Sequence, residues 1–146
     1  MAGMREVELA RIIRNDETPQ CHMYLRETEG SRIFPIIIHQ NEMSEILRKI
    51  NGHVVRRPMT HDLFASLMGA AGLRLESVEI TELKAEVFYA RMNFEAESGG
   101  SFSLDARPSD AVAIATGVHA QLFASEEILD EIGMVEAEGD DGEAPG

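Results

Sequence analysis

Two short segments of the sequence combine residue types that could bind and cleave a charged substrate. The first runs from Arg57 to Asp62 and reads RPMTHD, and the second runs from Asp105 to Asp110 and reads DARPSD. Each places Arg-Pro before a hydroxyl residue and an Asp, and an apolar stretch of helical periodicity follows. The repetition indicates two helix starts that carry similar chemistry.

The start of an α-helix presents unpaired N–H groups and a partial positive charge, so it attracts anions. Arg57 and Arg107 stand beside the two expected helix starts, and each could hold a phosphate through two parallel hydrogen bonds. Asp105 and Asp110, together with Asp62, could hold a divalent cation such as Mg²⁺ or Mn²⁺ through carboxylate oxygens.

His61 adds an imidazole, which could serve as an acid, a base or a metal ligand near neutral pH. Arginines for phosphate, carboxylates for a cation and a histidine for proton transfer together suit metal-assisted hydrolysis of a phosphodiester. The chain has no glycine-rich phosphate loop, no zinc-ligand spacing and no nucleophile elbow, so other familiar chemistries lack their motifs.

The same residues also have a purely structural interpretation. Pro ends the incoming segment, Thr60 or Ser109 caps the helix, and the Asp that follows favours the positive end of the helix dipole. Asp105 could equally pair with Arg107 or Arg57 in an internal salt bridge. Both interpretations stay open, because the sequence does not show that the two segments meet in space.

Hydrophobic periodicity predicts the elements that must position these segments. Alternating or short apolar runs predict strands at residues 5–14, 21–26, 33–38, 73–83, 87–94, 101–105 and 121–123. Apolar residues at helical spacing predict helices at residues 41–50, 60–71, 108–118 and 125–132. Because the strands cluster on both sides of a pair of helices, the sequence predicts an α+β fold. We expect a single compact domain of mostly antiparallel strands with about four short helices.

Individual residues mark the ends of these elements. Asn41 and Ser125 are the expected N-caps of the first and last helices. Gly52 is expected to close the first helix, and a turn is expected at residues 84–86. Pro35 lies inside a predicted strand, which indicates a position near a sheet edge or one without a ladder hydrogen bond.

Length and composition bound the class of protein. The 146 residues fit one domain at residues 1–134, followed by an acidic tail at residues 135–146 that we expect to be disordered. A single cysteine and the lack of a signal peptide or a transmembrane stretch favour a cytoplasmic location with no membrane partner.

The charge balance argues against generic nucleic-acid binding, which depends on Lys and Arg. The formal net charge is −13, and the tail contributes five acids and no base. However, 11 of the 13 basic residues are arginines, the better bidentate partners of phosphate. The base composition of the genome is an equally simple explanation of this excess. Any binding of nucleic acid must therefore depend on a local arrangement of arginines.

Five segments resemble the bifunctional nuclease family in their order and spacing. They are RPMTHDL at 57–63, VEI at 78–80, FYAR at 88–91, DARPSDA at 105–111 and SEEIL at 125–129. The likeness covers roughly residues 5–134, and DARPSDA is its most specific piece. The resemblance implies a small α+β domain with DNase and RNase activity that forms a wedge-shaped dimer with a groove.

The resemblance also implies the site residues, whose individual roles are our interpretation. The catalytic candidates are His61, Asp62, Asp105 and Asp110. The phosphate-binding candidates are Arg57, Arg107 and Ser109. Asp105 and Asp110 are also the candidate ligands of a divalent metal, Mg²⁺ or Mn²⁺. One departure is His39, which stands where the family usually has a glycine, whereas Glu42 keeps the family's acid.

Three hypotheses about function follow. The first is a nuclease that hydrolyses phosphodiester bonds in DNA and RNA with a divalent metal, as a homodimer or a higher homo-oligomer. The second is a non-catalytic regulatory module that uses the same helix starts to hold a small anion or a partner. The third is a structural dimer whose motifs only stabilise the fold.

Overall fold

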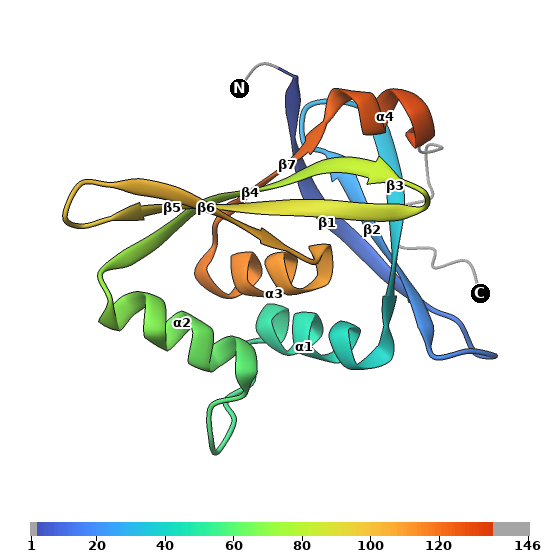
Figure 1. Cartoon of the computed structure of the whole chain (residues 1–146). Helices are drawn as coiled ribbons and strands as arrows, with labels where there is room; N and C mark the ends of the chain where they lie inside the picture. The colour runs from blue at the N-terminus through green and yellow to red at the C-terminus, as the bar shows by residue number, and fades with distance from the viewer. Residues whose placement is uncertain (1–2, 136–146) are drawn as a thin grey trace.

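A computed structural model describes residues 3–135, which form one curved sheet with helices packed against it (Figure 1). Within this range the strands follow the order β6-β5-β4-β7-β1-β2-β3-β8. Their bounds are β1 (Met4–Arg14), β2 (Gln20–Glu27), β3 (Arg32–His39), β4 (Leu73–Lys84), β5 (Val87–Ala96), β6 (Ser101–Ala106), β7 (Gln121–Ser125) and β8 (Met134–Val135). Every neighbouring pair is antiparallel except β4 and β7, which run parallel.

Four helices accompany the sheet in the described part of the chain. They are α1 (Gln40–Asn51), α2 (Thr60–Ala70), α3 (Pro108–Val118) and α4 (Glu126–Ile132). Together with the mostly antiparallel sheet, they confirm the predicted α+β class and the single compact domain. The two-residue strand β8 was not predicted, because it is too short to show a period.

Helix α3 lies at the centre of the domain, between the sheet and α1 (Figure 1). Its residues 108–115 are buried apart from Asp110, which is half-buried. The alanines of this helix leave little bulk between it and its neighbours, so α1, α2, β4 and β5 all pack against it. This packing brings the beginnings of α1, α2 and α3 into one region. Helix α4 packs separately against β3, β4 and β7.

The first two helices begin differently from the prediction. Asn41 is not an N-cap, because β3 continues through His39 and α1 starts at Gln40. Thr60 does not cap α2 either, because Met59 occupies the cap position. In each helix the carboxylate three residues after the cap accepts the N–H of the cap residue, at 2.8 Å. The acids at these N3 positions, Glu42 and Asp62, thus replace the predicted Asn and Thr caps.

Of the predicted N-caps of the last two helices, one is wrong and one is confirmed. Arg107 is the N-cap residue of α3 and Pro108 is its first helical residue, so the expected capping by Ser109 is wrong. Ser125 caps α4 as predicted, and its Oγ accepts the backbone N–H of Glu127 at 3.1 Å.

Several predicted turns and edges are confirmed. Gly52 ends α1 with a positive φ of 65°. Ala85 and Glu86 both adopt positive φ in the expected turn between β4 and β5. Pro35 lies on β3 beyond the two residues that pair with β8, where the strand edge is free within residues 3–135.

The ends of the described chain bear on the predicted tail. Val135, the first residue of the predicted tail, belongs to β8 and pairs with Arg32 of β3. Residues 136–146 lie outside the described range. None of the helices within residues 3–135 is long and apolar enough to cross a membrane.

Candidate functional site

Asp110 connects the beginnings of α2 and α3. Its Oδ1 atom lies 2.9 Å from Nε2 of His61, in the first turn of α2. Arg107, the cap residue of α3, donates to both oxygens of the same carboxylate, at 2.9 Å from Nε and 3.1 Å from Nη2. The two segments singled out in the sequence therefore meet in space, through three of the predicted site residues.

Two acids of α1 complete this arrangement. Glu42 Oε2 lies 2.7 Å from Nη1 of Arg107, and Glu45 Oε1 lies 3.6 Å from Nδ1 of His61. We call Glu42, Glu45, His61, Arg107 and Asp110 the helix-start cluster. Each ring nitrogen of His61 faces a carboxylate, and three helices contribute to the cluster.

Burial and charge set the protonation of this cluster. Partial burial works against ionisation of Asp110, but hydrogen bonds from Arg107 and His61 outweigh it and lower the pKa of the Asp110 carboxyl. The hydrogen bond to Asp110 and the charge of that carboxylate, with a smaller contribution from Glu42, raise the pKa of the Arg107 guanidinium. The side chain of Arg107 is nevertheless 65% exposed, so it can meet a solute without unfolding of the site.

Asp62 lies beside the cluster but points into different contacts. It accepts hydrogen bonds from Lys49, from Arg48 at 2.9 Å and from the backbone N–H of Met59 at 2.8 Å. The hydrogen bond from Lys49 is the main reason that the pKa of Asp62 lies well below its usual range. These contacts tie α2 to the end of α1, and Arg48 continues to Glu45 of the helix-start cluster.

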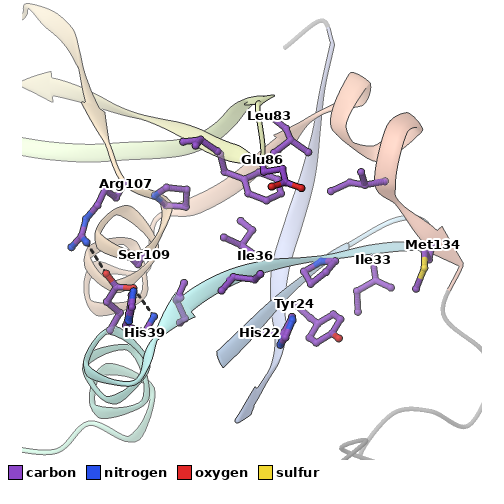
Figure 2. A pocket seen from close by; sticks show the side chains of 18 residues that line it. His22, Tyr24, Ile33, Ile36, His39, Leu83, Glu86, Arg107, Ser109 and Met134 are labelled. Atoms are coloured by element: carbon purple, nitrogen blue, oxygen red, sulfur yellow. Dashed lines mark hydrogen bonds and ion pairs between the residues drawn. The ribbon is translucent and has the colours of Figure 1, made fainter. Parts of the chain in front are cut away.

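A groove of about 860 Å³ opens next to the cluster. Figure 2 shows Arg107 and His39 at one end of it and Met134 at the other. Its walls come mainly from β3, from the tip of the β4–β5 hairpin and from the start of α3. Apart from the polar end, most lining side chains are apolar, Ile36 and Phe88 among them. The groove can therefore take the apolar part of a ligand whose charged part contacts Arg107.

The remaining predicted site residues lie apart from the cluster. Asp105 is exposed on β6, opposite Arg91 of β5, and lines a separate hollow of about 240 Å³. Arg57 is exposed in the loop before α2, and within residues 3–135 no salt bridge joins it to a carboxylate. Ser109 is buried and lines the groove from the second position of α3.

The metal expectation can be compared with these positions. Both oxygens of Asp110 already accept hydrogen bonds from Arg107 and His61, and Asp105 lines the other hollow. In the described part of the chain, no three His, Cys, Asp or Glu side chains are placed to share a metal ion. The donor set does not fit a resident divalent cation held by these two aspartates, and we derive no step through one.

Sequence reasoning did not include Glu45 among the candidates and noted Glu42 only as the acid that the family keeps at this position. The signal that could have found both is their spacing, since residues three apart share one face of a helix. His39, the departure from the family pattern, lies at the polar end of the groove and precedes α1.

Comparisons with known proteins agree with the motifs. A family model described as "Bifunctional nuclease domain" matches residues 23–137. Uncharacterized proteins from two strains of Mycobacterium tuberculosis are each 36% identical to this chain over 141 residues. These alignments cover 97% of this chain and 84% of each relative. The matched region contains every residue of the helix-start cluster.

Proposed function

The chain belongs to the bifunctional nuclease domain family, and from this premise we propose that it is a nuclease that hydrolyses phosphodiester bonds in DNA and RNA. The observation that carries the proposal is the shared carboxylate of Asp110. It holds a histidine and a highly exposed arginine together, and the arginine lines one end of the groove.

Arg107 supplies the phosphate contact in this proposal. Its guanidinium can donate to two oxygens of a phosphate, which carries its negative charge on those atoms. One of its nitrogens, Nη1, is paired with Glu42, and a phosphate would compete for that nitrogen. The charge of the substrate is thus met by a local cation, despite the net charge of −13.

His61 supplies the proton transfer. Asp110 can only accept hydrogen bonds when ionised, so it favours the tautomer in which Nε2–H of His61 points toward it. The other nitrogen, Nδ1, is 3.6 Å from Glu45, longer than a hydrogen bond, and is the atom that can exchange a proton with water or the leaving oxygen. Asp110 then orients the ring, as a carboxylate does in histidine-dependent hydrolases.

The second candidate, a regulatory module that binds a small anion or a partner, is favoured by one observation. Arg107, Asp110 and His61 satisfy one another in the absence of substrate. Such mutual pairing is also typical of a structural staple. The apolar groove would suit a bound partner equally well.

Cleavage assays separate these two candidates. Purified protein is incubated with plasmid DNA or single-stranded RNA in the presence of Mg²⁺, Mn²⁺ or EDTA. The Asp110→Asn variant is expected to lose about 100-fold or more in rate, since the histidine loses its orienting carboxylate. Loss of activity in EDTA would show that cleavage needs a metal ion that Asp105 and Asp110 do not hold by themselves. Asp105→Asn tests whether the carboxylate in the separate hollow takes part.

The matched control is Asp130→Asn, which changes an exposed aspartate on α4. It should cut as the wild type does. If wild type and Asp110→Asn show the same trace activity while both are folded, contamination is the simpler explanation, and the regulatory module becomes the better proposal.

The remaining parts of the proposal concern partners and location. Association into a homodimer and a cytoplasmic location are what the family resemblance and the sequence imply. Mass measurement in solution and fractionation of cells, respectively, test them.

A further inference from the structure

The two edges of the sheet differ in how they are protected. At the β3 edge, β8 covers Arg32 and Ile33, and Pro35 has no N–H to offer a further strand. At the other edge, β6 reads SFSLDA and contains neither Pro nor Lys, the residues that commonly block edge pairing. No strand within residues 3–135 pairs with its outer side.

The edge strand β6 also exposes two large apolar side chains. Phe102 is 41% exposed and Leu104 is 44% exposed. They alternate along the strand and lie opposite Phe94 and Met92 of β5, both of which are buried. The Phe102 ring stacks on Phe94 with centroids 5.1 Å apart. The apolar face of the sheet therefore continues to its last strand, β6, but the described helices leave the apolar side chains of that strand partly exposed.

Helix α2 packs against β4, near this end of the sheet, and also carries exposed apolar side chains. Its Phe64 lies 6.4 Å from Phe94, between ring centroids. On the same helix, Leu63 is 63% exposed and Leu67 is 65% exposed. Single exposed apolar residues are ordinary, but Phe102 and Leu104 lie together on an unpaired strand edge, and such a pair marks an interaction surface.

We propose that β6 is the surface through which two copies of this chain associate, by antiparallel pairing about a twofold axis at Ser103. This inference deepens the homodimer part of the proposed function and does not depend on cleavage. In a twofold interface, each pair of contacts occurs twice with the roles exchanged. The strand must therefore be complementary to itself.

The sequence of β6 meets this requirement at one register. With the axis at Ser103, Phe102 lies opposite Leu104 of the partner subunit. The twofold axis repeats this apolar contact, so each subunit covers both exposed residues of the other. Asp105, the one charged residue of the strand, lies opposite Ser101 of the partner subunit, whose hydroxyl can donate to it.

Other registers are less favourable. An axis at Leu104 would place Phe102 opposite the small Ala106, and an axis at Asp105 would bring two carboxylates together. Shifts that place an apolar residue opposite a polar one would move it to the wrong face of the sheet, because strand side chains alternate. Self-complementarity of size and charge is the reason to prefer a second copy over a different protein.

The first test measures the mass of the full chain in solution by light scattering. The wild type is expected to have twice the mass of one chain, and Leu104→Lys to have the mass of one chain, because a lysine would lie opposite Phe102 of the partner subunit. The control is Ile37→Lys, which changes an exposed apolar residue of β3, near the opposite end of the sheet, and should leave the mass doubled. The proposal would be overturned if the wild type were monomeric, or if only Ile37→Lys produced a monomer.

The second test reports the register and does not depend on the stability of Leu104→Lys. Under mild oxidation, Ser103→Cys should form a disulfide between two chains, because residues opposite across the axis lie within the roughly 7 Å that a disulfide spans. Ser101→Cys is the control, since its copies would lie about 13 Å apart along the strands. Native Cys21 is fully buried and should give no background. Failure of Ser103→Cys to cross-link in a dimer, or faster linking of Ser101→Cys, would exclude this register.

Each outcome is separable from the nuclease proposal. A cross-linked dimer without cleavage would retain the interface and remove the activity. Cleavage by a monomeric protein would retain the activity and remove the interface.

Discussion

Two charged clusters in this molecule are built from the same parts but differ in their access to solvent. In the helix-start cluster, Arg107 holds Asp110 through two hydrogen bonds, and the carboxylate is 34% exposed. In the second cluster, Arg32 holds Glu27 through two hydrogen bonds from its guanidinium and one from its backbone N–H, and that carboxylate is only 3% exposed. We call Glu27, Arg32 and their partners the Glu27 cluster.

The residues of the Glu27 cluster come from three parts of the fold. Arg5 of β1 donates to Glu27 at 3.2 Å. On the other side, Arg32 reaches Glu126 and Asp130 of α4, at 3.3 and 2.7 Å. The cluster joins the first strand, the β2–β3 hairpin and the last helix. Its buried centre can only hold the fold together, whereas the exposed Arg107 can also meet a substrate. Access, more than pairing chemistry, separates a structural cluster from a functional one.

The largest expected effect is on stability, from Glu27→Ala. Removal of this carboxylate leaves Arg32 half-desolvated without its main partner, which should lower the free energy of unfolding by about 3–5 kcal/mol. Urea denaturation measures it. Glu29→Ala, which changes an exposed acid two residues away, should cost less than about 0.5 kcal/mol. An equal loss of unfolding free energy in the two variants would show that the Glu27 cluster does not stabilise the fold.

Acid should weaken the Glu27 cluster next. The hydrogen bonds from Arg32 outweigh burial and lower the pKa of Glu27 from 4.5 to about 2. Because the folded pKa is the lower one, this stabilisation is present above pH 4.5 and is lost as the pH falls toward 2. The loss amounts to roughly 3 kcal/mol.

The measurement is the free energy of unfolding as a function of pH for the wild type and for Glu27→Gln. The variant is the control, because it keeps every other acid of the wild type. Its stability should depend less on pH in this acidic range. Parallel curves for the two proteins would contradict the assignment.

Arg107→Ala should affect cleavage more than stability. A charge-assisted hydrogen bond to phosphate is worth about 1.5–3 kcal/mol, so kcat/KM should fall roughly 10- to 100-fold. The matched control is Arg74→Ala, which removes an exposed arginine that pairs with Glu76 and Glu95 and should leave cleavage unchanged. A large loss of stability with unchanged cleavage would show that Arg107 stabilises the fold and does not contact the substrate.

The smallest expected effect concerns Asp62, which the sequence placed among the catalytic candidates. Its contacts to Arg48, Lys49 and the N–H of Met59 suggest that it holds α2 against α1. Asp62→Ala should therefore lower the free energy of unfolding by about 1–2 kcal/mol. Asp16→Ala, at an exposed turn position, is the stability control. If folded Asp62→Ala loses more activity than Arg107→Ala does, Asp62 belongs to the catalytic group.

Most of the elements could be predicted because their signals are local. The alternation of residues 73–83 predicts a strand, and the structure has Leu73–Lys84; the apolar spacing of residues 60–71 predicts a helix, and the structure has Thr60–Ala70. The helix starts were less predictable. Whether Asn41 or His39 caps α1 depends on where β3 ends, and the pairing of His39 with Gln20 on β2 sets that point.

The sequence by itself determined the class of fold, the positions of most strands and helices, and the two segments that hold His61, Arg107 and Asp110. The tertiary structure decided which of the candidate residues meet. His61 and Asp110 are 49 positions apart and touch only because α2 and α3 pack together. Asp105, by contrast, is close to Asp110 in sequence, yet its strand directs it to another hollow. Local periodicity reports which face of an element is apolar, but contacts between elements depend on how those faces pack.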